Sequence, residues 1–144
     1  MKQIETEIII DVKPERVWDV LTNFEKHPEW NPFIRSIEGN KKVGERLIVT
    51  IQPAIGRKMV FKPLVISFSV NRELKWKGTL GMEGIFDGEH YFILEQTNDG
   101  TTKLIHGERF SGILVGLLGG MVDKTREGFE AMNLSLKAEC ESLI

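Results

Sequence analysis

Three polar side chains in the second half of the sequence are the candidates for chemistry: His90, His106 and Glu108. They lie in stretches rich in β-branched and aromatic residues, where alternate side chains of a strand point to one face. The apolar residues that share their faces are Phe86, Phe92, Leu94, Leu104 and Phe110. If these faces look inward, the three polar groups point into an otherwise apolar interior.

Two kinds of role fit these residue types. His90 and His106 could act as general acid and base on a polyketide or a similar carbonyl compound, with Glu108 orienting one of them, because imidazole titrates near neutral pH. Alternatively, the three groups hydrogen-bond one another or a backbone carbonyl and satisfy buried polarity. Two adjacent strands supply no tight metal-ligand motif, so we expect no metal and no cofactor.

A long amphipathic helix is predicted over the C-terminal run Leu114–Ile144. Apolar side chains follow one another there at steps of three and four, which places them on one stripe of an α-helix. The stripe is Leu118, Val122, Thr125, Phe129, Met132, Leu136, Cys140 and Leu143. Charged residues such as Arg126 and Glu130 occupy the opposite face, so the helix needs a sheet to bury its stripe.

Upstream of this helix, the pattern predicts an α+β fold with mostly strands. Ile4–Val12 alternates like a half-buried strand, Pro14 opens a short helix that ends by about Phe24, and His27–Phe33 has room for at most one helical turn before its second proline. Six further strands with short connections predict an antiparallel meander. Their expected ranges are Ile34–Glu38, Arg46–Gln52, Arg57–Val70, Glu73–Thr79, Ile85–Gln96 and Thr101–Gly112.

A pocket follows from the widths of these elements. Seven strands at ~4.8 Å spacing make a sheet some ~34 Å wide, whereas a helix is only ~10–12 Å across, so the sheet must curl around the helix and leave volume at one end. Gly128, inside the helix, indicates close approach by a bulky neighbour or a ligand. The residues that we expect to line the pocket are Trp30, Phe33, Trp76, His90, Phe92, His106, Glu108, Phe110, Met121, Thr125, Phe129 and Met132.

Composition narrows the class of protein. The 144 residues suit one domain, spanning 1–144, and the net charge of -2 from 19 basic and 21 acidic residues predicts no nucleic-acid partner. The N-terminus lacks the apolar core of a signal peptide, and no run approaches the ~20 apolar residues of a membrane span. With Cys140 as the one cysteine, a buried position in a reducing cytoplasm is expected, and no oligomeric state is indicated.

Two segments resemble a known family. Pro14–Leu21, followed by Pro28–Ile34, is similar to the polyketide cyclase/dehydrase-like (SRPBCC) branch of the START and birch-pollen-allergen superfamily, and His106–Leu114 resembles its passage from last strand to long helix. The resemblance covers nearly the whole chain. It implies the helix-grip fold: a seven-stranded curved antiparallel sheet wrapped around a long C-terminal helix, with two short helices after strand one, enclosing a hydrophobic pocket.

Superfamily members include lipid and sterol carriers, aromatase/cyclases, coenzyme-Q-binding proteins and co-chaperone-like domains, so the fold does not select a function. The lack of a nucleophile-and-base pattern favours a non-enzymatic protein that binds or carries a lipid, an isoprenoid or an aromatic polyketide. The alternatives are a cyclase or dehydratase that uses His90, His106 and Glu108, and a co-chaperone-like protein-interaction module. The last alternative predicts an exposed apolar patch in place of a deep pocket.

Overall fold

The computed structural model describes residues 2–53, 56–79, 82, 84–98, 100–116 and 119–142, with the backbone alone at 119 and 121–123. Strands and helices alternate only at the start of the chain, after which a run of strands leads to one long helix. In chain order the elements are β1 (Lys2–Ile10), α1 (Pro14–Thr22), the 3-10 helix η1 (Phe24–Lys26), α2 (His27–Trp30), β2 (Ile34–Glu38), β3 (Ile48–Ile51), β4 (Met59–Phe61), β5 (Leu64–Ser69), β6 (Glu73–Thr79), β7 (Asp87–Gln96), β8 (Thr102–Ser111) and α3 (Gly119–Glu141).

The strands form two antiparallel sheets, so the expectation of one seven-stranded sheet is wrong. One sheet has five strands in the order β1-β8-β7-β6-β5, and the other has three in the order β2-β3-β4. The predicted strand Arg57–Val70 divides at Pro63, which has no N–H to donate to a ladder. The carbonyl of Pro63 instead accepts from the Leu47 N–H at 2.9 Å, and Arg46 makes a single bridge with Leu64.

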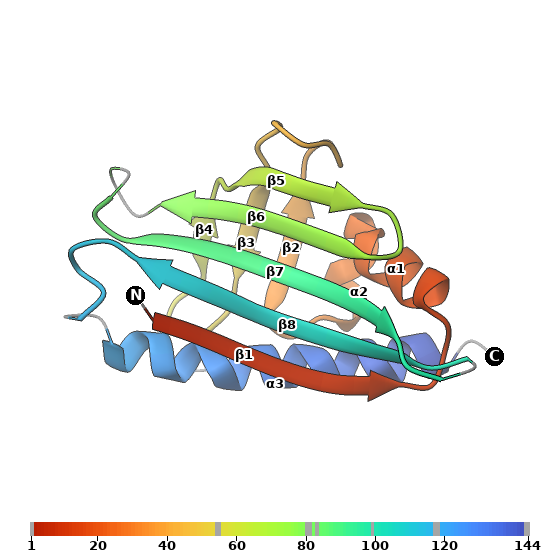
Figure 1. Ribbon diagram of the computed structural model, residues 1–144. Coiled ribbons are helices and arrows are strands. Elements are labelled where there is room, and N and C mark those ends of the chain that lie inside the picture. The colour runs from red at the N-terminus through yellow and green to blue at the C-terminus, as the bar shows by residue number, and fades with distance from the viewer. Residues whose placement is uncertain are drawn as a thin grey trace.

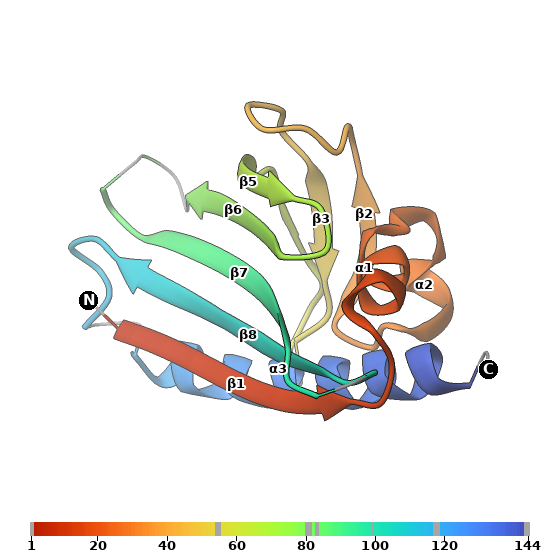
Figure 2. The ribbon, with the colours of Figure 1, turned by 45° about the vertical axis from the view of Figure 1, so that its right-hand side comes forward.

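The two sheets face each other, and α3 runs along the open side between them (Figure 2). Figure 1 shows the five-stranded sheet in front of β2, β3 and β4, with α3 next to the edge strand β1. The α+β class, the curved antiparallel sheet and the long C-terminal helix are therefore confirmed. The early helices also match: α1 begins at Pro14, and α2 is the single turn expected before Pro32.

The buried stripe of α3 is the one predicted from its spacing. Phe129, Met132, Leu136 and Cys140 are buried, and Thr125 is half-buried. Leu118, Leu143 and the side chain of Val122 lie outside the described residues. Burial raises the pKa of the Cys140 thiol to about 12, so this cysteine is a neutral small hydrophobe at neutral pH, as the sequence indicated.

A buried histidine fixes the bend between α2 and β2. The Nε2 atom of His27 lies 2.7 Å from the Leu21 carbonyl oxygen and must donate to it, so Nδ1 accepts from Nδ2 of Asn31 at 3.1 Å. The Oδ1 atom of Asn31 then accepts from the N–H groups of Phe33 and Ile34. This arrangement requires a neutral imidazole, and burial lowers the pKa of His27 to about 4.

Acid should therefore destabilise the fold before carboxylates titrate. Because the pKa of His27 is about 4 when folded and 6.5 in the reference state, the unfolded chain takes up the proton first as pH falls from 6.5 to 4. Linkage predicts a loss of about 2 kcal/mol in the free energy of unfolding between pH 7.5 and pH 5 from this group. Urea unfolding at both pH values should show a smaller loss for His27→Gln than for the parent. An equal loss in both proteins would contradict the assignment.

Gly128 is the point of close approach that its position inside the helix indicated. A Cβ added there would overlap Cδ1 of Phe33. A shift of the Phe33 ring would disturb its edge-to-face contact with Phe129, at 5.5 Å between centroids. The bulky neighbour anticipated from the sequence is therefore Phe33, which also lines the cavity described below.

Gly128→Ala should destabilise the protein although alanine is the better helix former. Overpacking against Phe33 costs about 1–3 kcal/mol, which exceeds the ~1 kcal/mol gained in helix propensity. Gly120 is a matched control in the same helix, because a Cβ there meets no atom within 4 Å. Thermal unfolding should show a lower Tm for Gly128→Ala and an unchanged or higher Tm for Gly120→Ala. A stabilised Gly128→Ala would show that the contact is looser than described.

Candidate functional site

A cavity of about 160 Å³ lies between the two sheets, next to the first described turns of α3. Its wall is mostly apolar and draws on both sheets and on the helix. The lining residues are Phe33, Val49, Ile51, Pro53, Met59, Phe61, Pro63, Trp76, Gly78, Thr79, Phe86, Gly88, His90, Glu108, Phe110, Lys124 and Thr125.

The cavity includes half of the residues predicted to line it. Phe33, Trp76, His90, Glu108, Phe110 and Thr125 are on its wall. Phe92, His106, Phe129 and Met132 are fully buried in the core beside it, and Trp30 lies in α2 with its ring 4.8 Å from that of His27. The side chain of Met121 lies outside the described residues.

Direct packing of the helix on the sheet explains why some predicted residues do not reach the cavity. The rings of Phe129 and His106 are stacked, with centroids 4.2 Å apart and an interplanar angle of 13°. The Phe129 ring is also 4.9 Å from that of His90. The expected gap between the middle of the helix and the sheet is therefore filled by these rings, and the free volume lies toward the N-terminal end of α3.

The wall formed by β3 and β4 was missed by the sequence analysis. Val49 and Ile51 alternate along β3, and Met59 and Phe61 alternate along β4, so each pair shares a face. The period-two pattern was visible in the sequence. Treating Arg57–Val70 as one strand concealed it, whereas Pro63 signalled a break that separates this wall from β5.

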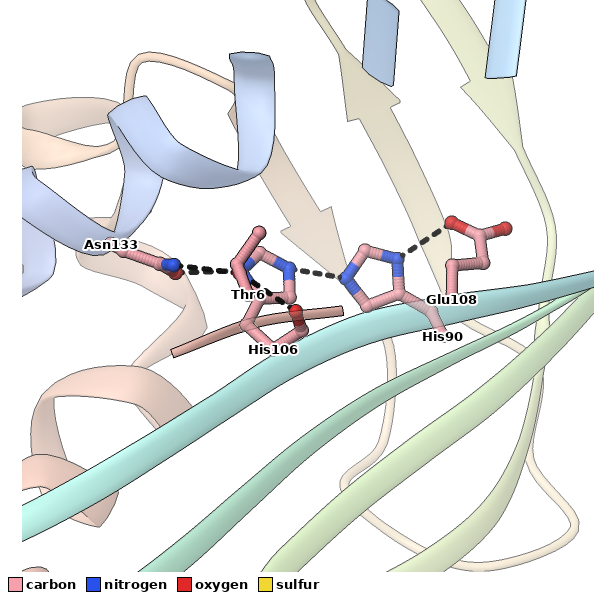
Figure 3. Close-up of polar contacts among 5 residues, drawn as sticks. All are labelled: Thr6, His90, His106, Glu108 and Asn133. Atoms are coloured by element: carbon pink, nitrogen blue, oxygen red, sulfur yellow. Dashed lines mark hydrogen bonds and ion pairs between the residues drawn. The ribbon is translucent and has the colours of Figure 1, made fainter. Parts of the chain in front are cut away.

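Beside the cavity, a chain of hydrogen bonds links Glu108 to the helix (Figure 3). The Oε1 atom of Glu108 is 3.1 Å from Nδ1 of His90, and Nε2 of His90 is 2.8 Å from Nε2 of His106. On its other side, Nδ1 of His106 is 2.8 Å from Oδ1 of Asn133 on α3. The chain continues to Thr6 on β1, whose Oγ1 atom accepts a hydrogen bond from Nδ2 of Asn133 at 2.8 Å.

Asn133 and Thr6 were not among the predicted site residues. Asn133 lies four residues after Phe129, on the buried side of α3, and is itself buried. A polar side chain on an apolar stripe signals a buried hydrogen-bond partner, so this residue could have been found from the helical spacing. Thr6 gave a weaker signal, because threonine is common on strands whether or not its hydroxyl is used.

Donor and acceptor counting fixes the protonation of His106. The Thr6 hydroxyl donates its proton to the backbone carbonyl of His106 at 2.8 Å, so toward Asn133 it can only accept. Asn133 must therefore present Nδ2 to Thr6 and Oδ1 to His106, and Nδ1 of His106 must carry a hydrogen. Burial lowers the pKa of His106 well below its usual value, so the ring is neutral and its Nε2 has no hydrogen.

The same counting places one proton between His90 and Glu108. Because Nε2 of His106 is an acceptor, Nε2 of His90 must be the donor in the 2.8 Å contact between the rings. The 3.1 Å contact between His90 Nδ1 and Glu108 Oε1 then needs a hydrogen on one of the two atoms. Either His90 is a cation beside a carboxylate, or a neutral His90 accepts from a protonated Glu108.

The carboxyl group of Glu108 lies against the backbone of β7 at Gly88. A Cβ added at Gly88 would overlap Oε2 of Glu108, so only glycine leaves room for the carboxyl in this place. His90 and Glu108 both lie on the cavity wall, and Glu108 is the more accessible of the two, because its side chain is 18% exposed and that of His90 is 2% exposed. Among the described residues, no cluster of His, Cys, Asp or Glu has the arrangement of a metal site.

Comparisons with solved structures show the same fold. A START superfamily protein from Mycobacterium smegmatis matches with a TM-score of 0.78 and 18% identity, covering 99% of each chain. A protein from Thermus thermophilus matches with a TM-score of 0.75 and 18% identity, covering 98% of each. Norcoclaurine synthase from Thalictrum flavum, in complex with dopamine and hydroxybenzaldehyde, matches with a TM-score of 0.76 and 14% identity, covering 99% of this chain and 88% of the synthase.

No curated protein sequence matches the chain. The family described as "Polyketide cyclase / dehydrase and lipid transport" matches residues 1–141, which is nearly the full length and includes every element of the fold. The two segments that resembled this family, around Trp18 and Trp30 and around His106, form α1, α2 and β8 in the structure. The chain therefore belongs to the polyketide cyclase/dehydrase and lipid transport family.

Proposed function

We propose that this protein binds a small hydrophobic or amphipathic molecule in the cavity between its two sheets. The observation that carries the proposal is the cavity itself, of about 160 Å³, with a mostly apolar wall and a carboxyl group at one side. An apolar cavity of about 150 Å³ is large enough to hold benzene. A one-ring aromatic compound or a compact isoprenoid suits this volume, and a larger polyketide or lipid would need the wall to move outward.

The family supports a ligand of this kind without naming it. Its description joins polyketide cyclases and dehydrases with lipid transport, two activities that both use an apolar pocket. The norcoclaurine synthase structure holds dopamine and hydroxybenzaldehyde, which are one-ring aromatic molecules. At 14% identity that likeness supports only the capacity of the fold to enclose such compounds.

A carrier located in the cytoplasm is the form of the proposal that we favour. Cys140 is a free, buried thiol, which suits a reducing compartment. Within the described residues, the helices include none with the length and apolar character needed to cross a membrane. The cavity favours a small-molecule ligand over the alternative of a co-chaperone-like interaction module.

Filling the cavity should abolish binding without loss of the fold. Ile51 is half-buried on the wall, so Ile51→Trp should place an indole in the cavity. Ile48 is exposed on the same strand, and Ile48→Trp is the matched control. Native mass spectrometry of the purified protein should show a co-purifying small molecule in the parent and in Ile48→Trp, and none in Ile51→Trp. The same bound mass in all three proteins would place the ligand elsewhere.

An acid–base enzyme is the second candidate, and the proton arrangement at Glu108 favours it. A carboxylate held by the His90 cation can take a proton from a bound substrate through Oε2 while Oε1 still accepts from Nδ1 of His90. Glu108 would then be the catalytic residue. His106 has both ring nitrogens occupied in the core, so it would act by positioning His90.

The enzyme candidate predicts base catalysis on a ring-bearing ketone. Exchange of the α-hydrogens of 2-tetralone in D₂O, followed by NMR, should be accelerated by the parent protein. Glu108→Gln should lower the acceleration by about 10²–10⁴-fold, the usual contribution of a positioned base. Glu95→Gln, an exposed change on the same β7–β8 pair, should leave it unchanged. Exchange at the buffer rate in every protein would argue against this candidate.

A further inference from the structure

We propose that the pocket selects apolar molecules that carry a hydrogen-bond donor, such as a hydroxyl or amine group, and that Oε2 of Glu108 accepts from this donor. The inference rests on the proposed binding function and adds the chemical class of the ligand. It follows from the hydrogen-bond chain that begins at Thr6 and ends at the pocket wall.

Oε2 is an acceptor wherever the shared proton lies. When His90 is the cation, Glu108 is a carboxylate and both of its oxygens accept. When the proton is on Glu108, it sits on Oε1 and points to Nδ1 of His90, which leaves Oε2 as the carbonyl oxygen of the acid. With the proton in either position, Oε2 therefore offers a hydrogen-bond acceptor to a ligand.

The position of Oε2 makes this acceptor available to a ligand. Gly88 and Glu108 both line the cavity, and Oε2 is the oxygen next to the Cα atom of Gly88. Figure 3 shows this oxygen on the side of the carboxyl group that points away from His90. Apart from His90 and the indole of Trp76, the other lining residues with polar side chains are Thr79 and Lys124, which are exposed, and Thr125, which is half-buried.

Desolvation of Oε2 makes the pocket prefer ligands that carry a hydrogen-bond donor. A ligand that fills the cavity displaces water from Oε2, and a buried acceptor without a donor is unfavourable, more so when it is charged. A hydrocarbon or an ether offers no hydrogen to replace the water. A carboxylate adds repulsion between two acceptors, with the exposed Lys124 as the cation on the wall that could offset it.

A series of one-ring compounds with the same propyl group tests the proposal. Isothermal titration calorimetry at pH 7.5 should show a Kd for 4-propylphenol at least about 10-fold lower than that for 4-propylanisole. One net hydrogen bond to a charged group lowers Kd by about tenfold or more. We expect 4-propylbenzoate to bind more weakly than the phenol as well. Equal affinities for the phenol and the anisole would overturn the selectivity but leave the binding function intact. No binding by any of the three compounds would overturn both.

Two variants assign the preference to Glu108. Glu108→Leu removes the acceptor, and Gly88→Ala keeps the glutamate but occupies the place of Oε2. Both should reduce the preference for the phenol over the anisole to less than about 3-fold, while Glu95→Leu should keep the parental ratio. Gly88→Ala keeps the test valid if Glu108→Leu does not fold. A parental ratio in Gly88→Ala, with binding retained, would overturn the role of Oε2.

The proton arrangement can be measured directly. Long-range ¹⁵N–¹H correlation spectra of the parent at pH 7.5 should show His106 as the neutral tautomer with hydrogen on Nδ1, and His90 with hydrogen on Nε2. Finding hydrogen on Nε2 of His106 would reverse the direction of the chain. Nδ1 of His90 would then donate to Glu108, and the proton count that makes Oε2 an acceptor in both states would be wrong, which removes the basis of the proposal.

Discussion

The stacking of Phe129 on His106 is the contact on which the rest of the site depends. It seats the middle of α3 directly on β8, at a centroid distance of 4.2 Å, and closes the space between helix and sheet there. Because α3 is straight and the five-stranded sheet curves away from it, free volume remains toward the N-terminal end of the helix. The same contact buries His106 fully, which keeps its imidazole neutral and lets Asn133 reach its Nδ1.

The sequence predicts those features of the structure that depend on residues close together in the chain, and it does not predict those that depend on long-range packing. The stripe of α3 follows from steps of three and four, and the inward faces of β7 and β8 follow from alternation, so the approach of His90, His106 and Glu108 could be foreseen. Pro63 marked the end of β4, but its consequence, a second sheet facing the first, depends on long-range packing. For a single seven-stranded sheet the cavity is expected against Phe129 and Met132, whereas with two sheets it lies between them.

The hydrogen-bonded residues of the site specify donor and acceptor directions, whereas the rest of the core specifies volumes. Apolar contacts such as that of Phe33 with Phe129 fix volumes, and many side chains of similar size would satisfy them with modest rearrangement. Each hydrogen bond from Thr6 to His90 instead has a defined direction of donation, because a single reversal would leave two donors or two acceptors face to face. The hydrogen-bonded chain therefore lets Thr6 on the edge strand β1 determine the donor and acceptor roles of His106 and of the ring nitrogen of His90 that faces it.

The residues that set these hydrogen-bond directions lie near opposite ends of the polypeptide. Thr6 and Asn133, which set the direction of the hydrogen bonds made by His106, are separated by 127 positions, whereas the residues that contact the cavity lie between them. During synthesis on the ribosome, β7 and β8 emerge before Asn133. Until Asn133 is present, the hydrogen bond that orients the imidazole of His106 cannot form. The pocket acquires its chemical polarity only when the last helix docks, because Asn133 and part of the cavity wall belong to that helix.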